Sequence, residues 1–306
     1  MRADQNRYYM MKRSALRPDL PTGEALRATA GEMLAAARSA ISDPSLKTDK
    51  AVHEFRKSIK RWRAFLRLIE PFIGDSAKTL RAGARAAAQR LGGARDLRSI
   101  LDALDDLRDC DKPLDEPIFE ACREKITALL TAEEQKGVTA ADRDAIAAGI
   151  DRWSATIEAQ TFEHIGFAEI SEALTDGYRR AFRTSPQNWA KASEDELHEF
   201  RRRAIDHRYQ LELIEPLWPR MTRIWIDEVQ RLRDALGKHR DLALLQLLAG
   251  ARRPLAAHRA KLVPAIEARQ HAHLLRAEKI ASRIFAEKPG AFRRRIESLW
   301  QAGGGD

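Results

Sequence analysis

An internal repeat restricts the fold of this chain more than any other feature. The stretch VHEFRKSIKRWRAFLRLIEPF at residues 52–72 recurs as LHEFRRRAIDHRYQLELIEPL at residues 197–217, and 10 of the 21 positions are identical. The same offset of 145 residues, without a gap, aligns LGGARDL with LGKHRDL. Two blocks that share one spacing indicate a duplicated unit of roughly 120–145 residues.

Helical periodicity dominates the chain and strand alternation is nearly absent, so the sequence predicts an all-α protein. Each copy of the repeat has room for about four helices, and we therefore predict two four-helix bundles related by a pseudo-two-fold axis. The predicted halves are residues 20–140 and 167–290, joined by a connecting helical segment at 141–166. Helices are expected at residues 22–42, 48–70, 75–109, 116–136, 140–162, 167–184, 192–215, 220–250, 255–286 and 290–301.

The first copy of the repeated helix carries positive charge on one side only. At about 100° per residue, one arc of about 120° holds a histidine and five cations, and the apolar residues lie opposite. The arc comprises His53, Arg56, Lys57, Lys60, Arg63 and Arg67. A solvated helix face normally interleaves acids with bases, but residues 52–67 carry six bases and one acid, Glu54. Like charges at this spacing destabilise a helix by about 0.2–0.5 kcal/mol per pair, which favours a bound polyanion over a merely solvated face.

The second copy predicts a weaker strip, in which Ile205 stands where Lys60 is and Glu212 stands where Arg67 is. We therefore expect the N-terminal strip to contribute more binding energy. His207 falls on the apolar side and is predicted to be a hydrogen-bonded core or interface histidine. The candidate binding residues of this copy are His198, Arg201, Arg202 and Arg208.

The second repeated block, LGGARDL and LGKHRDL, admits two interpretations. Arg95 and Arg240 would extend the cationic surface, or the aspartate beside each would hold a basic side chain by a charge-assisted bond. Gly92 and Gly237 are expected to permit close helix approach or a local kink. In GYRRAFR, the basic residues are further candidates or an ordinary solvated face; Arg179 and Arg183 are the two included in the candidate site.

The formal net charge of +9, from 54 basic and 45 acidic residues, favours a polyanionic partner: nucleic acid, an anionic membrane or a phosphate polymer. No catalytic residue, metal site or cofactor is predicted, because HEFRK is not a HExxH motif and no phosphate-binding Gly-rich loop is present. Two cysteines, Cys110 and Cys122, with no apolar run of signal-peptide or membrane-span length, lead us to expect a soluble cytoplasmic protein.

The sequence resembles the CHAD domain, the histidine α-helical domain, over about residues 20–290. Two pairs of motifs carry the resemblance: HEFRKSIKRWR followed by LGGARDL, and LHEFRRRAIDHRY followed by LGKHRDL. The resemblance implies a central basic groove or pore that binds inorganic polyphosphate, and association with polyphosphate granules. Ile205 departs from the lysine that the pattern has at this position. No strand-rich Glu-x-Glu region accompanies the motifs, so the resemblance does not imply triphosphate hydrolysis. The ligand role carries over to His53, Arg56, Lys60 and Arg63 in the first motif, and to His198, Arg201 and Arg208 in the second.

The leading hypothesis is therefore non-catalytic binding of inorganic polyphosphate. The alternatives are a metal-assisted polyphosphate-processing enzyme and a generic polyanion or nucleic-acid binder. A nucleic-acid site would interleave aromatic residues with the cations, but Phe55, Trp62 and Phe65 lie opposite them. We also expect polyphosphate to raise the pKa of His53 and His198 and to bind more tightly at lower pH.

Overall fold

The computed structural model describes residues 14–303, except residues 44, 47, 92, 110–113 and 136. These residues form eleven α-helices and four short 3₁₀ turns, with no β-strand among them, so the predicted all-α class is confirmed. The α-helices are α2 (Thr22–Ser42), α3 (Thr48–Ile73), α4 (Asp75–Arg90), α5 (Gly93–Asp106), α6 (Glu116–Glu134), α7 (Ala140–Glu158), α8 (Phe167–Thr184), α9 (Glu194–Leu213), α10 (Pro219–Leu248), α11 (Arg259–Ile284) and α12 (Pro289–Ala302).

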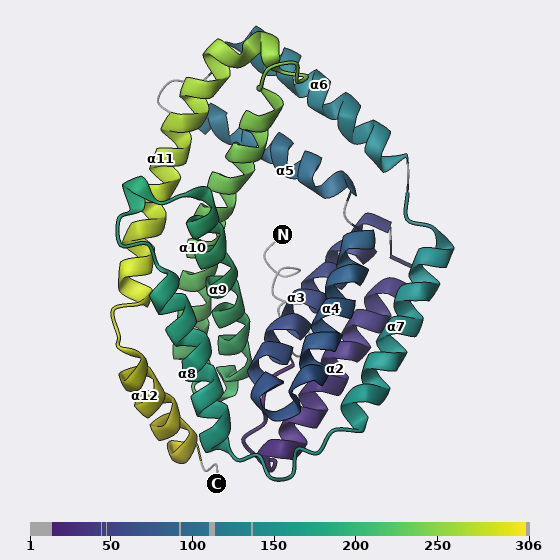
Figure 1. Cartoon of the computed structure of the whole chain (residues 1–306), viewed down its shortest axis with the longest axis vertical. Helices are drawn as coiled ribbons and strands as arrows, with labels where there is room; N and C mark the ends of the chain where they lie inside the picture. The colour runs from purple at the N-terminus through teal and green to yellow at the C-terminus, as the bar shows by residue number, and fades with distance from the viewer. Residues whose placement is uncertain are drawn as a thin grey trace.

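The helices form two groups that meet along α3 and α9 (Figure 1). One group contains α2, α3, α4 and α7, and the other contains α8, α9, α12 and the adjoining parts of α10 and α11. At the far end, α5 and α6 pack against the remaining parts of α10 and α11 over a separate apolar core. This second core contains residues from both predicted halves, including Leu104 of α5 and Leu245 of α10. The division of the chain into residues 20–140 and 167–290 stays a prediction.

One predicted helix is wrong. Residues 75–109 do not form a single helix, because α4 ends at Arg90 and α5 begins at Gly93. The aligned stretch of the second copy continues through Gly237 within α10. The first copy has two successive glycines where the second has Gly-Lys, and each glycine weakens a helix by about 1 kcal/mol relative to alanine. Gly92, where we expected close approach or a kink, lies outside the described residues.

Helix α3 has the two-sided character that its sequence predicted. Its apolar face is buried, with Phe55, Ile59, Trp62 and Phe65 each at most 1% exposed. Burying such side chains contributes about 1.5–3 kcal/mol each, so this face fixes the rotation of α3 about its axis. The cationic residues are therefore held on the side of α3 that turns away from this core.

His207 lies in the core, as predicted, and is packed edge-on against the rings of Tyr178 and Phe292. Its predicted hydrogen bonding is wrong for Nε2, which has no hydrogen-bond partner. Burial lowers the pKa of His207 to about 3, so the imidazole is neutral at neutral pH. Its place among aromatic rings explains why a neutral histidine is tolerated there.

Cys122 is a free, buried thiol of the second core, whereas Cys110 lies outside the described residues. In the part of the chain that the structure describes, no helix combines the length and the apolar character needed to cross a lipid bilayer.

Candidate polyanion-binding site

The cationic side of α3 faces α9, and two ion pairs connect these helices. Arg61 Nε lies 2.9 Å from Glu212 Oε2, and Arg67 Nη1 lies 2.5 Å from Asp206 Oδ1. The residue number rises along α3 as it falls along α9, so the two helices are antiparallel. The strip therefore lies at the junction of the two groups of helices and not on an open surface.

The two ion pairs correspond to each other under the offset of the repeat. An offset of 145 residues aligns Arg61 with Asp206 and Arg67 with Glu212, so each pair maps onto the other. A pseudo-two-fold axis between α3 and α9 would produce this arrangement, although the duplication itself stays a prediction. In the sequence, Glu212 only interrupts the positive charge of the second strip. In the structure it is the buried ion-pair partner of Arg61 and of Arg208.

The charges of four arginines from four helices act on the side chain of Lys60. They are Arg56 of α3, Arg95 of α5, Arg201 of α9 and Arg233 of α10, and we call these five residues the Lys60 cluster. Burial, followed by the charges of these arginines, lowers the pKa of Lys60 to about 7. Among the described residues, Lys60 forms no hydrogen bond or ion pair. The cluster is thus a concentration of positive charge that the chain itself leaves uncompensated at its centre.

Arg201 is the part-buried arginine that α9 contributes to the Lys60 cluster. Burial and the charge of Arg233 lower its pKa to about 10, against a smaller opposing effect of Asp241. Its Nε atom is buried and has no hydrogen-bond partner. An unpaired buried donor of this kind is unfavourable, so an anion that reached Arg201 would be bound strongly.

The first repeated motif contacts the second in both halves of the chain. Arg56 Nη1 donates to the carbonyl oxygens of Ala88 at 3.0 Å and Leu91 at 3.3 Å, at the C-terminal end of α4. The aligned arginine, Arg201, lies over Gly237, where an added Cβ would be 3.5 Å from Nη2. The arginine of each HEFR motif is therefore positioned by the LG motif of its own half, and a cation at a helix C-terminus is also favoured by the helix dipole.

The two Arg-Asp motifs meet at one open pocket of about 610 Å³ between α5 and α10. Arg95 and Arg240 both line it, so both extend the cationic surface. Asp241 lies close enough to Arg201 and Arg240 for their charges to oppose the burial that raises its pKa. The arginines therefore face the pocket, whereas neither Asp96 nor Asp241 forms the expected charge-assisted bond among the described residues, and Asp241 acts on neighbouring arginines through its charge alone.

The same pocket is also lined by six aspartates, three of which have their own basic partners. Asp106 is buried and accepts hydrogen bonds from Lys238 at 2.6 Å, Arg269 at 2.9 Å and His273 at 2.5 Å. Although burial alone would raise it, these bonds hold the pKa of Asp106 well below its usual range. Asp105 pairs with Arg123, and Asp234 with Arg233. In the described ranges, no three His, Cys, Asp or Glu side chains come together in a group that could hold a metal ion.

A second open pocket, of about 730 Å³, lies between α9 and α10 and shares Arg201 and Arg240 with the first. His198 lines it at the edge of α9. Burial, followed by the charges of Arg240, Arg202 and Arg201, lowers the pKa of His198. The two pockets therefore adjoin at a pair of arginines, one from each motif of the second copy.

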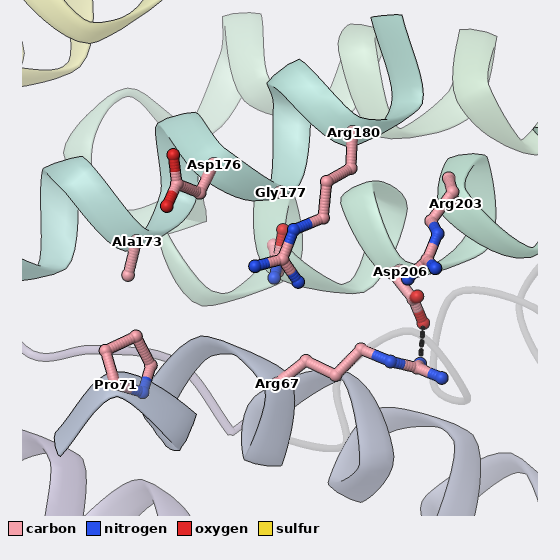
Figure 2. A pocket seen from close by; sticks show the side chains of 9 residues that line it. Arg67, Pro71, Ala173, Asp176, Gly177, Arg180, Arg203 and Asp206 are labelled. Carbon is pink, nitrogen blue, oxygen red and sulfur yellow. Dashed lines mark hydrogen bonds and ion pairs between the residues drawn. The ribbon is translucent and has the colours of Figure 1, made fainter. Parts of the chain in front are cut away.

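The other end of the strip forms a second arginine-rich region around Asp206. Figure 2 shows Arg67 bonded to Asp206, with Arg180 of α8 and Arg203 of α9 close by. The pocket here is only about 20 Å³, room for roughly one water molecule. Burial, followed by the charge of Arg67, lowers the pKa of Arg63, whose Nε also lacks a hydrogen-bond partner. This region is filled by protein atoms and is less open than the pocket beside the Lys60 cluster.

Several predicted site residues carry carboxylate partners of their own. Lys57 lies 3.8 Å from Glu54, and Arg208 lies 3.0 Å from Glu212. His53 and Arg183 are exposed. Two further candidates are paired along their own helices: Arg179 with Asp176 and Arg202 with Glu199.

The structure adds basic residues that sequence reasoning missed. Arg233 belongs to the Lys60 cluster, and Arg81 and Arg85 of α4 act on Arg63. The repeat gave no signal for Arg233, because the offset aligns it with Ala88. The signal for Arg203 was the run of three arginines in HEFRRR, from which only the first two were selected.

Comparison with known proteins identifies the arrangement. A family model described as the CHAD domain matches residues 24–250. The fold resembles the crystal structure of the CHAD domain from the plant Ricinus communis, with 19% identity, 94% of each chain covered and a TM-score of 0.57. It also resembles PptA from Streptomyces chartreusis, with 14% identity, 93% of this chain and 99% of that chain covered, and a TM-score of 0.55. At these identities the likeness concerns the fold alone, and a search of curated proteins gives no match.

Proposed function

The chain belongs to the CHAD domain family, and from that premise we propose that it binds inorganic polyphosphate without catalysing a reaction on it. The observation that carries the proposal is the Lys60 cluster, in which cations from four helices converge with no carboxylate partner for Lys60 or Arg201 among the described residues. Such a cluster is unfavourable unless an anion completes it. Association with polyphosphate granules is part of the same proposal.

The pocket beside the cluster suits a flexible chain of phosphates. Arg95, Arg201 and Arg240 line it, and their planar guanidinium groups can each donate two hydrogen bonds to phosphate oxygens. Protonated Lys60 adds one further positive charge to the cluster. Arg201 and Arg240 also line the adjoining pocket, so a bound chain can extend from one pocket to the other across these two arginines. Aromatic residues of α3 are buried on the opposite face, which favours recognition of phosphates over stacking of bases.

The test is direct binding of long-chain polyphosphate at near-physiological salt, by isothermal titration calorimetry, with the double variant Arg95→Ala/Arg240→Ala. Both arginines face the pocket and neither forms an ion pair among the described residues. The matched control is Arg223→Ala/Arg231→Ala, which removes two charges from the same helix, α10, at positions paired with Glu215 and Glu228.

We expect the pocket variant to bind at least about tenfold more weakly and to lower the slope of log affinity against log salt by about 1.4–1.8, since each phosphate contact contributes about 0.7–0.9. The control should change affinity less than twofold. An equal loss in both variants would contradict the assignment of the site.

Two further measurements separate the alternatives. Equal displacement by single-stranded RNA would indicate a generic polyanion binder. Release of phosphate from polyphosphate in the presence of Mg²⁺ would indicate the metal-assisted enzyme instead.

A further inference from the structure

Three of the other four cations in the strip have partners that Lys60 lacks, while Arg63 likewise forms no hydrogen bond or ion pair among the described residues but feels the charge of Asp206. Arg56 is bonded to carbonyl oxygens, Arg67 is paired with Asp206, and Lys57 lies beside Glu54. Lys60 has no such partner within the described residues, and the charges that lower its pKa most belong to arginines of four helices: Arg56 of α3, Arg95 of α5, Arg201 of α9 and Arg233 of α10. Three of these arginines, Arg95, Arg201 and Arg233, line one pocket together with Asp96 and Asp241, which form no ion pair among the described residues.

Protonating the amine of Lys60 in this environment adds a fifth positive charge to four fixed ones. An arginine cannot relieve the repulsion, because a guanidinium stays protonated in proteins. Lysine can, because its amine gives up a proton when buried or placed beside other cations. Lys60 is therefore the one member of the cluster whose charge can adjust to what is bound there.

We propose that Lys60 takes up a proton when polyphosphate binds, so that binding at the Lys60 cluster is coupled to pH in the neutral to alkaline range. This inference rests on the proposed function and assigns a regulating residue to the same site. A polyanion beside the arginines reduces the repulsion that keeps the amine neutral and adds negative charge near Lys60, which has no ion-pair partner among the described residues.

The direction of the coupling follows from proton linkage. In the free protein burial and the four arginines lower the pKa of Lys60 to about 7, and a bound polyanion shifts this pKa back towards its ordinary value of 10.5. Between these values the complex holds more protons than the free protein, so affinity falls as pH rises. The loss is at most about tenfold per pH unit above pH 7, and below about pH 7 Lys60 adds no further change.

Histidine gives a different profile. In the free protein, burial and the charges of Arg240, Arg202 and Arg201 lower the pKa of His198 below its ordinary 6.5. Proton uptake by His198 therefore begins at a lower pH than uptake by Lys60. A His198→Asn variant removes that contribution, and the remaining pH dependence belongs to Lys60.

The experiment is calorimetric titration of the full chain with long-chain polyphosphate at pH 6.5, 7.5, 8.5 and 9.0, at constant ionic strength. Each titration is repeated in two buffers of different ionisation enthalpy, which gives the number of protons taken up on binding. The proteins are the wild type, Lys60→Met, Lys60→Arg and His198→Asn. Lys57→Met is the matched control, because it removes one charge from the same helix at a residue that already lies beside Glu54.

We expect the wild type and His198→Asn to take up close to one proton per site near pH 8 and to lose affinity as pH rises. Lys60→Met should bind weakly with no such dependence, and its affinity should converge with that of the wild type at alkaline pH. Lys60→Arg should stay tight across the range, and Lys57→Met should bind more weakly with the wild-type slope. Far-ultraviolet circular dichroism establishes that each variant is folded.

Three results overturn the inference. If Lys60→Met keeps the wild-type proton uptake, or if the wild type binds polyphosphate without taking up a proton, the coupling does not reside in Lys60 and the proposed function stands. If the wild type binds no polyphosphate at any of these pH values, the proposed function fails and the inference fails with it.

Discussion

Replacing Lys60 by methionine should make the ligand-free protein more stable. In the folded state the amine is partly buried among four arginines, whereas in the unfolded chain it is surrounded by water. Methionine has a similar length and shape and removes only the charge. The variant therefore relieves repulsion at the Lys60 cluster while it keeps the packing of α3 against its neighbours.

The size of the effect follows from the pKa. A fall from 10.5 to about 7 corresponds to about 5 kcal/mol of unfavourable interaction for the charged form. The side chain keeps some contact with solvent, which screens part of this, so about 2–4 kcal/mol is expected at pH 7. With an unfolding entropy of about 2.1 cal/mol/K per residue, a chain of this length should gain roughly 3–6 °C in Tm.

The pH dependence of the free energy of unfolding provides a second, independent test of this prediction. Between pH 7 and 10.5 the unfolded chain binds more protons at Lys60 than the folded chain does. Wild-type stability should therefore rise with pH in this range, by up to about 1.4 kcal/mol per unit, and the advantage of Lys60→Met should shrink as it does so.

Thermal unfolding of both proteins at pH 7, 8, 9 and 10, followed by circular dichroism, measures this difference. Lys57→Met, at a residue of the same helix whose side chain is 43% exposed, should shift Tm by less than about 1 °C. A lower Tm for Lys60→Met than for the wild type at pH 7, or a difference that does not change with pH, would refute the electrostatic reasoning.

Three further substitutions test other parts of the site. Glu212→Gln should lower the free energy of unfolding by about 2–3 kcal/mol in urea, because it leaves Arg61 part-buried without its carboxylate; an unchanged midpoint would mean that this pair contributes nothing. Asp206→Asn should raise polyphosphate affinity and steepen its salt dependence by about 0.7–0.9, because it releases Arg67 for the ligand; equal titrations for both proteins would contradict this. Arg56→Met should speed hydrogen exchange at the C-terminal end of α4 and lower stability by about 1–2 kcal/mol, because two carbonyl oxygens lose their donor; wild-type exchange rates there would argue against a capping role.

The sequence predicted those features of the fold that depend on local periodicity. The buried face of α3 follows from the spacing of its apolar residues, and the structure has Phe55 and Trp62 where that spacing requires them. The break between α4 and α5 was missed because Gly92 and Gly237 were given the same interpretation, although only the first copy has a second glycine beside it; the stretch around Gly237 is continuous in α10. A repeat transfers a prediction from one copy to the other even where a single glycine makes them differ.

The candidate site was predicted less completely, because its properties arise where distant segments converge. The sequence placed Lys60 and Arg201 on matching helices, but the low pKa of Lys60 also requires Arg95 and Arg233 from two other helices. The position of a residue around one helix does not show which residues of other helices lie near it. The same limit applies to Arg61, which falls outside the predicted strip and pairs with a carboxylate 151 positions further along the chain.

The acidic residues of α9, Asp206 and Glu212, favour the pairing of α9 with α3. Under the offset of the repeat, identical copies of α3 and α9 would set arginine against arginine at both contacts. In this chain the first copy has Arg61 and Arg67, and the second has Asp206 and Glu212, so both contacts are complementary. Pairing of two α3 helices from separate chains would set basic against basic in the same geometry, and pairing of two α9 helices would set acid against acid.

This division of charge favours the pairing of α3 with α9 over the pairing of two α3 helices or two α9 helices from separate chains. The specificity comes from charge repulsion in the alternative pairings. The division of charge also neutralises cations at the end of the strip away from the Lys60 cluster, because Asp206 pairs with Arg67 and Glu212 pairs with Arg208. The positive charge that remains free for a ligand is thereby concentrated at the Lys60 cluster, where no carboxylate forms an ion pair with Lys60 or Arg201 among the described residues. The same few differences between the two repeated segments thus favour the pairing of α3 with α9 and leave the proposed binding site localised at the Lys60 cluster.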